Sequence, residues 1–448
     1  MVNSSIYIIS LAFNQTKFWY EITINNLSAK LNYIIVSFDT ESSEFLKRKK
    51  VDFVNAEKII QKSEKIYQID QLEKKVNLNT QSIKKILNHE FIFFGKRNEK
   101  KILKKFLVTS LFFEEYFSQK KNCIFIHEIG GFIPNISTSL FCKKFKFDFY
   151  NLETSFYYNH FHILKNTSDC NPEKNNKKEK FNLVEYLNNI KLNKRINIPT
   201  KDKLHFSGPF KKFLYLHNIK RFFQKQFRIH FLNYNYVFGH DFLIVRENIK
   251  CFFNYLLLKR KYIKLERLEK LNFYYFPLHV PNDFALTMRA FNFVDQLKFI
   301  ENIAKKFPDT IFAIKEHPAR IGSFQYNQMR NLLNQNKNIF LFEPDTNNFE
   351  ILKKCKGVIT INSKSGFEGM LYNKKIITFG ESFYKNFKNA NFFNNIKNLE
   401  SLNFQNSSEA ELYKDLQNLY DKSFKGSLYS MDKINIDNFS KSLAMYFD

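Results

Sequence analysis

Short apolar runs alternate with longer amphipathic stretches along most of this chain. Residues 310–314 and 357–361 contain β-branched and aromatic residues without a helical period, which is typical of short buried strands. We interpret seven further runs in the same way, at residues 6–12, 31–38, 90–94, 123–126, 273–276, 339–342 and 376–379. The pattern predicts helices at residues 295–307, 349–356, 367–372 and 434–447. Strands that alternate with helices predict an α/β fold with parallel sheets.

Two of the predicted strands end directly in polar residues. The strand at residues 310–314 is followed by Lys315, Glu316 and His317. The strand at residues 357–361 is followed by a loop and the start of a helix, whose relevant residues are Asn362, Ser363, Lys364, Ser365, Gly366 and Glu368. Groups just beyond the carboxyl ends of strands in an open α/β sheet line the ligand crevice. The two signatures therefore predict an anion site, and a phosphate is the expected ligand.

The expected phosphate contacts differ by residue type. The hydroxyls of Ser363 and Ser365 and the free amides at the helix start would cradle the phosphate, and Lys315 and His317 would supply positive charge. Glu368 would accept hydrogen bonds from a ribose diol. Each residue alone also has a structural interpretation, in which one serine is a helix N-cap, Glu368 completes a capping box and His317 starts a turn. Their combination at consecutive strand ends favours the binding site.

Five motifs follow one another in the order of a known family. Residues 277–283, the Lys-x-His-Pro turn at 315–318, the Asn-Ser-x-x-Gly-x-Glu loop at 362–368 and the Gly-x-x-Phe-Tyr strand end at 380–384 are preceded by residues 127–134. Residues 276–384 thereby resemble the donor half of the bacterial capsule polysaccharide synthesis transferases, which move Kdo from CMP-Kdo. The sequence departs from the family pattern at His279, Gly131 and Ile133, where the family has Gln, an aromatic residue and Arg. These departures concern the acceptor and the sugar more than the nucleotide.

The resemblance implies an α/β fold of the GT-B type, in which two Rossmann-like domains face an interdomain cleft. We assign residues 1–268 to an N-terminal acceptor-binding domain with a basic insertion around residues 160–268. Residues 269–430 are expected to form a C-terminal domain that binds the nucleotide-sugar donor. Residues 431–448 are expected to form a helix that packs back on the N-terminal domain. A chain of 448 residues is long enough for two such domains.

The N-terminal domain offers candidate acceptor contacts after two of its strands. Asn14 and Lys17 follow the first strand, and they either contact the acceptor or belong to a plain turn with a helix cap. Glu128 follows the strand at residues 123–126. Gly130 and Gly131 come next, where the missing side chains would let a substrate approach the backbone. The alternative is that Glu128 is a structural hydrogen-bond acceptor for this glycine-rich loop.

Three residues are assigned catalytic roles. The resemblance implies transfer with retention at the anomeric carbon, and a double displacement needs a carboxylate nucleophile and a second acid/base group. We assign Asp283 as the nucleophile and Glu128 as the base on the acceptor hydroxyl, two roles that are interchangeable on this evidence, and His317 as the third member. The sequence has no Asp-x-Asp pair that would hold a divalent cation against a diphosphate. We therefore expect no metal and no cofactor.

A formal charge of +27 indicates an anionic partner. For a transferase that acts on a lipid-linked acceptor, this partner would be the inner-membrane surface. Residues 220–228 and 251–260 mix aromatic and basic residues at helical spacing, which fits either helices on a membrane surface or core helices with a basic outer face. The sequence has neither an apolar run long enough to span a membrane nor a signal-peptide pattern, and its five cysteines are scattered. We expect a cytoplasmic protein, peripheral to the inner membrane.

These observations predict a transferase that moves Kdo from CMP-Kdo to a glycan or glycolipid acceptor in the synthesis of a capsule or related surface polysaccharide. The alternative enzyme is a GT-B transferase that uses another CMP-sugar, such as CMP-sialic acid. A basic nucleic-acid-binding protein would rest on the net charge alone. Because the sequence contains no recognisable nucleic-acid-binding motif, we expect no nucleic acid partner.

Overall fold

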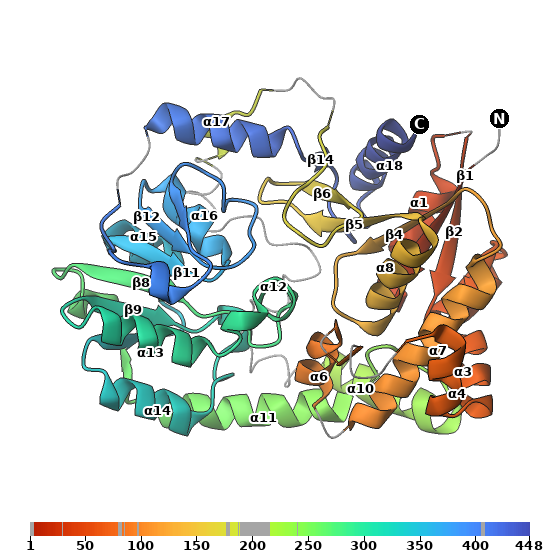
Figure 1. Cartoon of the computed structure of the whole chain (residues 1–448), viewed down its shortest axis with the longest axis horizontal. Coiled ribbons are helices and arrows are strands. Elements are labelled where there is room, and N and C mark those ends of the chain that lie inside the picture. The colour runs from red at the N-terminus through yellow and green to blue at the C-terminus, as the bar shows by residue number, and fades with distance from the viewer. Residues whose placement is uncertain are drawn as a thin grey trace.

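The chain forms two α/β domains, each built on a seven-stranded sheet (Figure 1). The computed structural model describes residues 4–28, 30–78, 83–84, 86–95, 98–175, 180–186, 188, 216–239, 241–404 and 408–448. The part of the expected basic insertion at residues 189–215 lies outside the described residues. Two Rossmann-like sheets facing one cleft confirm the expected α/β fold of the GT-B type.

The first sheet has the strand order β14-β6-β5-β4-β1-β2-β3. Its strands are β1 (Ser4–Ser10), β2 (Leu31–Ser37), β3 (Phe53–Asn55), β4 (Cys123–Glu128), β5 (Asp148–Thr154), β6 (His160–Lys165) and β14 (Phe424–Lys425). In the sheet, β3, β2, β1, β4 and β5 run parallel to one another. β6 is antiparallel to its two neighbours, β5 and β14. The strand order reverses between β1 and β4, so the loops after these two strands flank a topological switch point. The helices here are α1 (Phe13–Ile24), α2 (Thr40–Lys49), α3 (Ala56–Ile66), α4 (Ile69–Val76), α6 (Asn88–Phe94), α7 (Glu99–Phe117) and α8 (Ile133–Phe145).

The second sheet is parallel throughout, with the order β13-β12-β11-β8-β9-β10-β7. Its strands are β7 (Tyr262–Ile263), β8 (Phe273–Pro277), β9 (Ile311–Lys315), β10 (Ile339–Phe342), β11 (Gly357–Thr360), β12 (Lys375–Thr378) and β13 (Ala390–Phe392). The central strand β8 is buried at every position, as expected for a parallel strand covered on both faces. The helices are α12 (Phe284–Thr287), α13 (Gln296–Lys306), α14 (Tyr326–Gln335), α15 (Asn348–Lys354), α16 (Lys364–Leu371) and α17 (Glu409–Tyr420).

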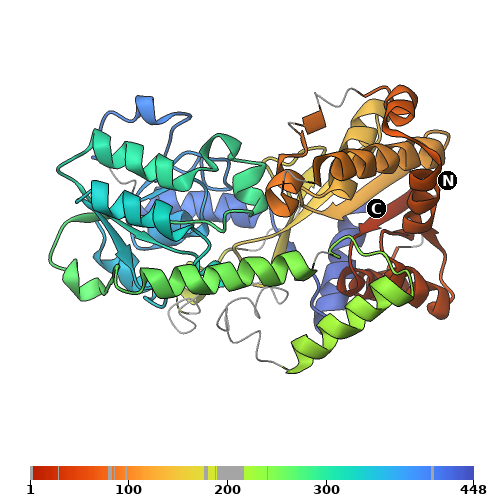
Figure 2. The same ribbon diagram turned by 90° about the horizontal axis from the view of Figure 1, so that it is seen from below.

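Two long helices, α10 (Leu216–Phe231) and α11 (Asp241–Leu258), run along one side of both domains (Figure 2). α10 is tied to the first domain because Arg228 pairs with Glu41 of α2 at 2.5 Å. α11 packs on α14 of the second domain. The chain therefore crosses between the domains within this helix pair.

Backbone pairing places both domain boundaries earlier in the sequence than expected. β7 already belongs to the second sheet, so the boundary assigned at residue 268 comes too late. β14 returns to the first sheet, so the boundary assigned at residue 430 also comes too late. α18 (Lys433–Phe447) follows and packs on α1 and β14. Two-residue edge strands join a sheet through main-chain hydrogen bonds, which leave no hydrophobic pattern in the sequence.

The prediction of a strand at residues 90–94 is wrong, because this segment belongs to helix α6. A short apolar run fits a buried helix as well as a strand. The deciding contact is tertiary: the carboxylate of Glu90 accepts a hydrogen bond from the backbone N–H of Ile133 at 2.7 Å, which ties α6 to the start of α8. α6 also reaches across to α12 of the second domain.

Candidate functional site

A cleft of about 1660 Å³ lies between the two domains. Its lining comes from loops at the carboxyl ends of strands of both sheets and from residues of α10 and α11. Among the predicted site residues, those that line the cleft are Glu128, Asp283, Lys315, Glu316, His317, Asn362, Ser363, Lys364, Ser365 and Glu368. His317 and Ser365, from strands on opposite sides of β8, are thus brought to one cavity.

Lys315 ends β9 and is almost completely buried. Its Nζ donates a hydrogen bond to the carbonyl oxygen of Thr346 at 3.0 Å. Burial lowers the pKa of Lys315 to about 8, against the opposing effect of the nearby carboxylates of Glu368 and Asp345. The ammonium is therefore mostly protonated at pH 7, and it is one of the positive charges that line this wall, with Lys364.

His317 caps the short 3-10 helix η6 (Pro318–Arg320). Its Nδ1 accepts a hydrogen bond from the backbone N–H of Ala319 at 3.2 Å, so the ring proton of the neutral imidazole sits on Nε2. Burial lowers the pKa of His317 to about 4, although Asp283 acts in the opposite direction. At pH 7 the side chain is a neutral hydrogen-bond donor, whereas the sequence analysis expected a positive charge.

Glu316 is fully buried, and its contacts are with the protein. One carboxylate oxygen accepts from the Tyr262 hydroxyl at 2.9 Å, and the other accepts from the backbone N–H of Gly322 at 3.0 Å. Burial raises the pKa of Glu316 to about 7. Through these contacts Glu316 holds the loop after β9, which carries His317, against β7, and its donor-binding role stays a prediction.

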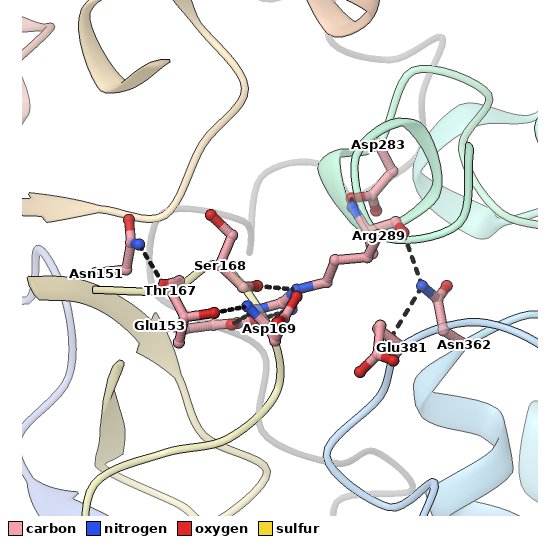
Figure 3. Close-up of polar contacts among 10 residues, drawn as sticks. Asn151, Glu153, Thr167, Ser168, Asp169, Asp283, Arg289, Asn362 and Glu381 are labelled. Atoms are coloured by element: carbon pink, nitrogen blue, oxygen red, sulfur yellow. Dashed lines mark hydrogen bonds and ion pairs between the residues drawn. The ribbon is translucent and has the colours of Figure 1, made fainter. Parts of the chain in front are cut away.

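The serine loop forms the N-terminus of α16. Ser363 is the N-cap, and its hydroxyl accepts from the backbone N–H of Ser365 at 3.2 Å. The amide nitrogen of Asn362 donates to the carbonyl oxygens of Ala285 at 2.7 Å and Glu381 at 3.2 Å, so Asn362 ties three loops together (Figure 3). Lys364 is exposed in the first turn of the helix. The N-cap interpretation of Ser363 and a phosphate cradle are compatible, since the capping geometry aims the first amides of α16 at the cleft.

Gly366 has a packing role. A β-carbon at this position would lie 2.5 Å from the hydroxyl oxygen of Tyr384. The Tyr384 hydroxyl in turn donates to the carbonyl oxygen of Ser363 at 2.5 Å. Gly366 is buried and does not line the cleft, so its expected contact with the donor is corrected to close helix packing that positions the serine loop.

Glu368 belongs to a group of hydrogen-bonded residues. One member of this group, Asn348, was not predicted from the sequence. Asn348, at the start of α15, donates to the Glu368 carboxylate and to the Ser365 hydroxyl, the latter at 3.1 Å. The Tyr275 hydroxyl donates to the Asn348 side-chain oxygen at 2.8 Å. Burial raises the pKa of Glu368 to about 7. The polar residues after β10 were the available signal for Asn348.

Asp283 is the N-cap of α12, where its carboxylate accepts from the backbone N–H of Ala285 at 3.0 Å. It is exposed to the cleft. The charge of Asp283 acts on three histidines, His89, His279 and His317. Burial lowers the pKa of each to about 4, and the interaction with Asp283 opposes that shift. Asp283 is therefore an exposed carboxylate near neutral imidazoles, and it is the candidate nucleophile of this wall.

The first-domain wall is centred on Glu128. Its carboxylate accepts from the side-chain amide of Gln15 at 3.0 Å, and the Gln15 oxygen accepts from the backbone N–H of Leu11 at 2.8 Å. Asn14 and Lys17 are in the first turn of α1, and neither lines the cleft, although both lie in the described part of the chain. The Lys17 ammonium instead lies 4.4 Å from the ring centroid of Phe13. Gln15, between the two predicted residues, is the one that reaches the site.

The two glycines after β4 are explained by packing. A β-carbon at Gly131 would lie 2.5 Å from Cγ of His89, and one at Gly130 would lie 3.1 Å from the side-chain oxygen of Asn135. His89 is itself held by a hydrogen bond between its Nδ1 and the Thr287 hydroxyl at 2.8 Å. The expected approach of a substrate to this backbone is therefore corrected to an approach of α6 and α8.

An ion pair joins the two domains at the cleft, and the sequence analysis did not identify it. The guanidinium of Arg289, after α12, binds the carboxylate of Glu153 on β5 in a bidentate arrangement at 2.9 and 2.6 Å (Figure 3). Its Nε donates to the carbonyl oxygen of Ser168 at 2.7 Å. The Arg289 side chain is only 4% exposed. This pairing holds the two walls in one relative position.

Among the described residues, no group of three or more His, Cys, Asp or Glu side chains is arranged to hold a metal ion. The expectation of metal-free chemistry stays a prediction.

Comparisons with known proteins support one family. Residues 233–388 match the family model described as capsule polysaccharide biosynthesis protein. The chain is 31% identical over 122 residues to Protein FixF of Sinorhizobium fredii, a match that covers 25% of this chain and 27% of that protein. The chain thus spans about a quarter of the length of this curated relative.

Solved structures similar to the chain have low sequence identity. Thermosulfurimonas dismutans KpsC, beta Kdo 2,7 transferase, is 13% identical with a TM-score of 0.35, over 75% of this chain and 89% of that chain. The UDP-GlcNAc 2-epimerase from Methanocaldococcus jannaschii is 10% identical with a TM-score of 0.24, over 98% of this chain and 99% of that chain.

Proposed function

We propose that the protein is a glycosyltransferase of capsule or surface polysaccharide synthesis, because residues 233–388 match the family model described as capsule polysaccharide biosynthesis protein. Its donor is CMP-Kdo, and its acceptor is a glycan or glycolipid. The observation that carries the proposal is the convergence of Lys315, His317 and the N-terminus of α16 on one cleft, opposite Glu128. Such a wall binds the single phosphate of a CMP-sugar.

The leaving group is stabilised by three kinds of contact. The Lys315 ammonium neutralises phosphate charge, Nε2–H of His317 donates a hydrogen bond, and the first amides of α16 add the positive end of a helix dipole. Because none of these contacts needs an ion, the proposed reaction is independent of metal. The raised pKa of Glu368 leaves it partly protonated near pH 7, which limits its repulsion of the phosphate.

The proposed chemistry is a double displacement with retention. An oxygen of Asp283 attacks the anomeric carbon of the sugar, the bond to the phosphate oxygen breaks, and CMP leaves with the bonding electron pair. Glu128 then takes the proton from the acceptor hydroxyl, whose oxygen attacks the same carbon and releases Asp283. Gln15 orients Glu128 by the 3.0 Å hydrogen bond. The closed cleft limits attack by water.

The test is the release of CMP from two donors, CMP-Kdo and CMP-sialic acid, with and without a glycolipid acceptor. We expect release from CMP-Kdo, and mass spectrometry of the denatured protein to show a Kdo adduct on the peptide that contains Asp283. Release from CMP-sialic acid alone would change the sugar and keep the transferase. Absence of CMP binding in calorimetry would contradict the proposed donor site itself.

A further inference from the structure

Two neighbouring helices expose an unusual amount of apolar surface. Of the 25 exposed large hydrophobic side chains in the described part of the chain, 13 lie between residues 216 and 257, on α10, on α11 or directly after α10. Both helices lie along the lower edge of Figure 1 and on the side that faces the viewer in Figure 2. Of the two interpretations that the sequence left open for residues 220–228 and 251–260, this exposure favours helices on a surface over core helices.

On α10 the exposed residues form one stripe. Phe223, Phe227 and Phe231 follow each other at intervals of four, so they share a side of the helix, and their exposed fractions are 64%, 54% and 74%. The opposite side is attached to the protein: the Lys225 ammonium pairs with the Asp241 carboxylate of α11 at 2.9 Å and donates to the carbonyl oxygen of Phe238 at 2.6 Å. The stripe therefore points to solvent because the helix is anchored by its other side.

α11 has the same organisation. Ile249, Phe253 and Leu257 are exposed by 49%, 58% and 56%, at spacings that again place them on one side. Cys251 on the other side is buried, and the Asn254 amide donates to the carbonyl oxygen of Gly322 at 3.0 Å. α11 is thus fixed on the second domain, with its apolar stripe outward.

Basic residues accompany both stripes. Residues 216–261 contain nine Lys and Arg residues and two acidic residues. Those of the basic residues that are exposed are Lys220, Arg221, Arg246, Lys250, Lys259, Arg260 and Lys261. The surface therefore combines aromatic and aliphatic side chains with an excess of positive charge.

We propose that the exposed face of α10 and α11 docks on an anionic lipid bilayer. Helices that lie in a membrane interface need aromatic and aliphatic side chains that enter the acyl boundary and basic side chains that meet anionic headgroups. In the described part of the chain no helix is long and apolar enough to cross a membrane, so the helices lie on the bilayer. Positive charge alone would suit nucleic acid, but the phenylalanine stripe needs an apolar layer beneath the charged one.

This docking face is next to the cleft. Asn248 of α11 lines the cleft and accepts a hydrogen bond from Arg320, beyond His317, at 2.5 Å. If the proposed function holds, a lipid-linked acceptor in the same bilayer would meet the mouth of the cleft without leaving the membrane. The docking itself does not depend on which sugar is transferred.

The test is flotation of the full chain with phosphatidylcholine vesicles, with and without phosphatidylglycerol. We expect binding to the anionic vesicles that weakens as salt increases. The triple replacement Phe223→Ser, Phe227→Ser, Phe231→Ser should reduce the partition coefficient by about tenfold or more. Each of Lys250→Gln and Lys259→Gln should reduce it by about fivefold.

The matched control is Ile434→Ser with Met445→Ser on α18, whose side chains are 71% and 62% exposed and which lies at the opposite edge in Figure 1. This control should bind vesicles like the unaltered protein. CMP affinity should be the same in all variants, which separates docking from the donor site and from misfolding.

Three results would overturn the proposal. They are no binding to anionic vesicles, equal binding by the triple variant, and lipid-free self-association that the triple variant abolishes. Retention on duplex DNA that depends on the lysines but not on the phenylalanines would assign the surface to nucleic acid instead. Loss of CMP release from CMP-Kdo in the presence of a soluble acceptor, with vesicle binding intact, would contradict only the proposed function.

Discussion

The two walls of the cleft are built on similar sheets, but the residues that line them were predictable from the sequence to different degrees. In the second-domain wall, Lys315, His317 and Ser365 follow β9 and β11 and line the cleft. In the first-domain wall, Asn14 and Lys17 lie in α1 away from the cleft. The difference shows that following a strand end does not by itself bring a residue to the cleft, because α1 begins three residues after β1 and neither Asn14 nor Lys17 lines it.

The two walls are alike in the role of their glycines. Gly131 and Gly366 were both expected to admit a ligand, yet each makes room for a protein side chain, His89 and Tyr384 respectively. In both walls the ligand-facing atoms are side chains and amides one or two residues away. The predictions below test this division between reacting groups and supporting groups.

The largest effect is expected for Asp283→Asn. Asparagine keeps the N-cap of α12 but cannot act as the nucleophile, so transfer should fall by roughly 10⁴-fold or more while CMP affinity is retained. Steady-state CMP release and calorimetry measure the two quantities. Asp295→Asn, at the N-cap of α13 in the same domain, is the control and should remain active. Full activity of Asp283→Asn would remove this residue from the chemistry.

Lys315→Met should weaken CMP binding by roughly 10- to 100-fold, because it removes a charge-assisted hydrogen bond. The pH dependence has a clear sign. With the pKa of Lys315 lowered to about 8, the charge that favours phosphate is present below pH 8, and affinity should fall by up to about tenfold per pH unit above it.

Calorimetry with CMP from pH 7 to 9 checks this slope, which Lys315→Met should abolish. The exposed Lys353→Met on α15 should change neither affinity nor slope. A slope that persists in Lys315→Met would mean that another group senses the phosphate.

Gly131→Ala should lower the free energy of unfolding by about 1–3 kcal/mol, because the added methyl group overlaps the ring of His89. Gly130→Ala should cost less, since its neighbour is the end of the Asn135 side chain. Urea unfolding compares the two. A raised KM for the acceptor without loss of stability would restore the acceptor role expected from the sequence.

The smallest effects are expected for Asn14→Ala and Lys17→Ala, each within about twofold in transfer rate, because surface changes away from the site are usually small. Gln15→Ala should raise the KM or lower the rate by more, since Gln15 holds Glu128. Equal effects of all three replacements would abolish the distinction between Gln15, which contacts Glu128, and its neighbours Asn14 and Lys17.

Much of the fold was predictable from short-range patterns. The apolar runs that became β1, β2, β4 and β8 to β12 are buried strands, as predicted, because each run is contiguous and its burial pattern is local. The run at α6 was misassigned, and the strands β3, β5, β6, β7, β13 and β14 were not predicted. The conformation of α6, β7 and β14 depends on partners that are far away in the sequence.

By itself the sequence determined that Lys315, His317 and the Ser363 loop lie at the ends of parallel strands, which meet at one edge of a sheet. The structure placed these strands on either side of β8. Only the tertiary structure decided which polar groups are left for a ligand. Glu316 turned inward because Tyr262 and Gly322 complete its hydrogen bonds, and Arg289 met Glu153 because two domains close on each other. A buried polar group takes whichever partner the fold provides, and that partner is not encoded within its own segment.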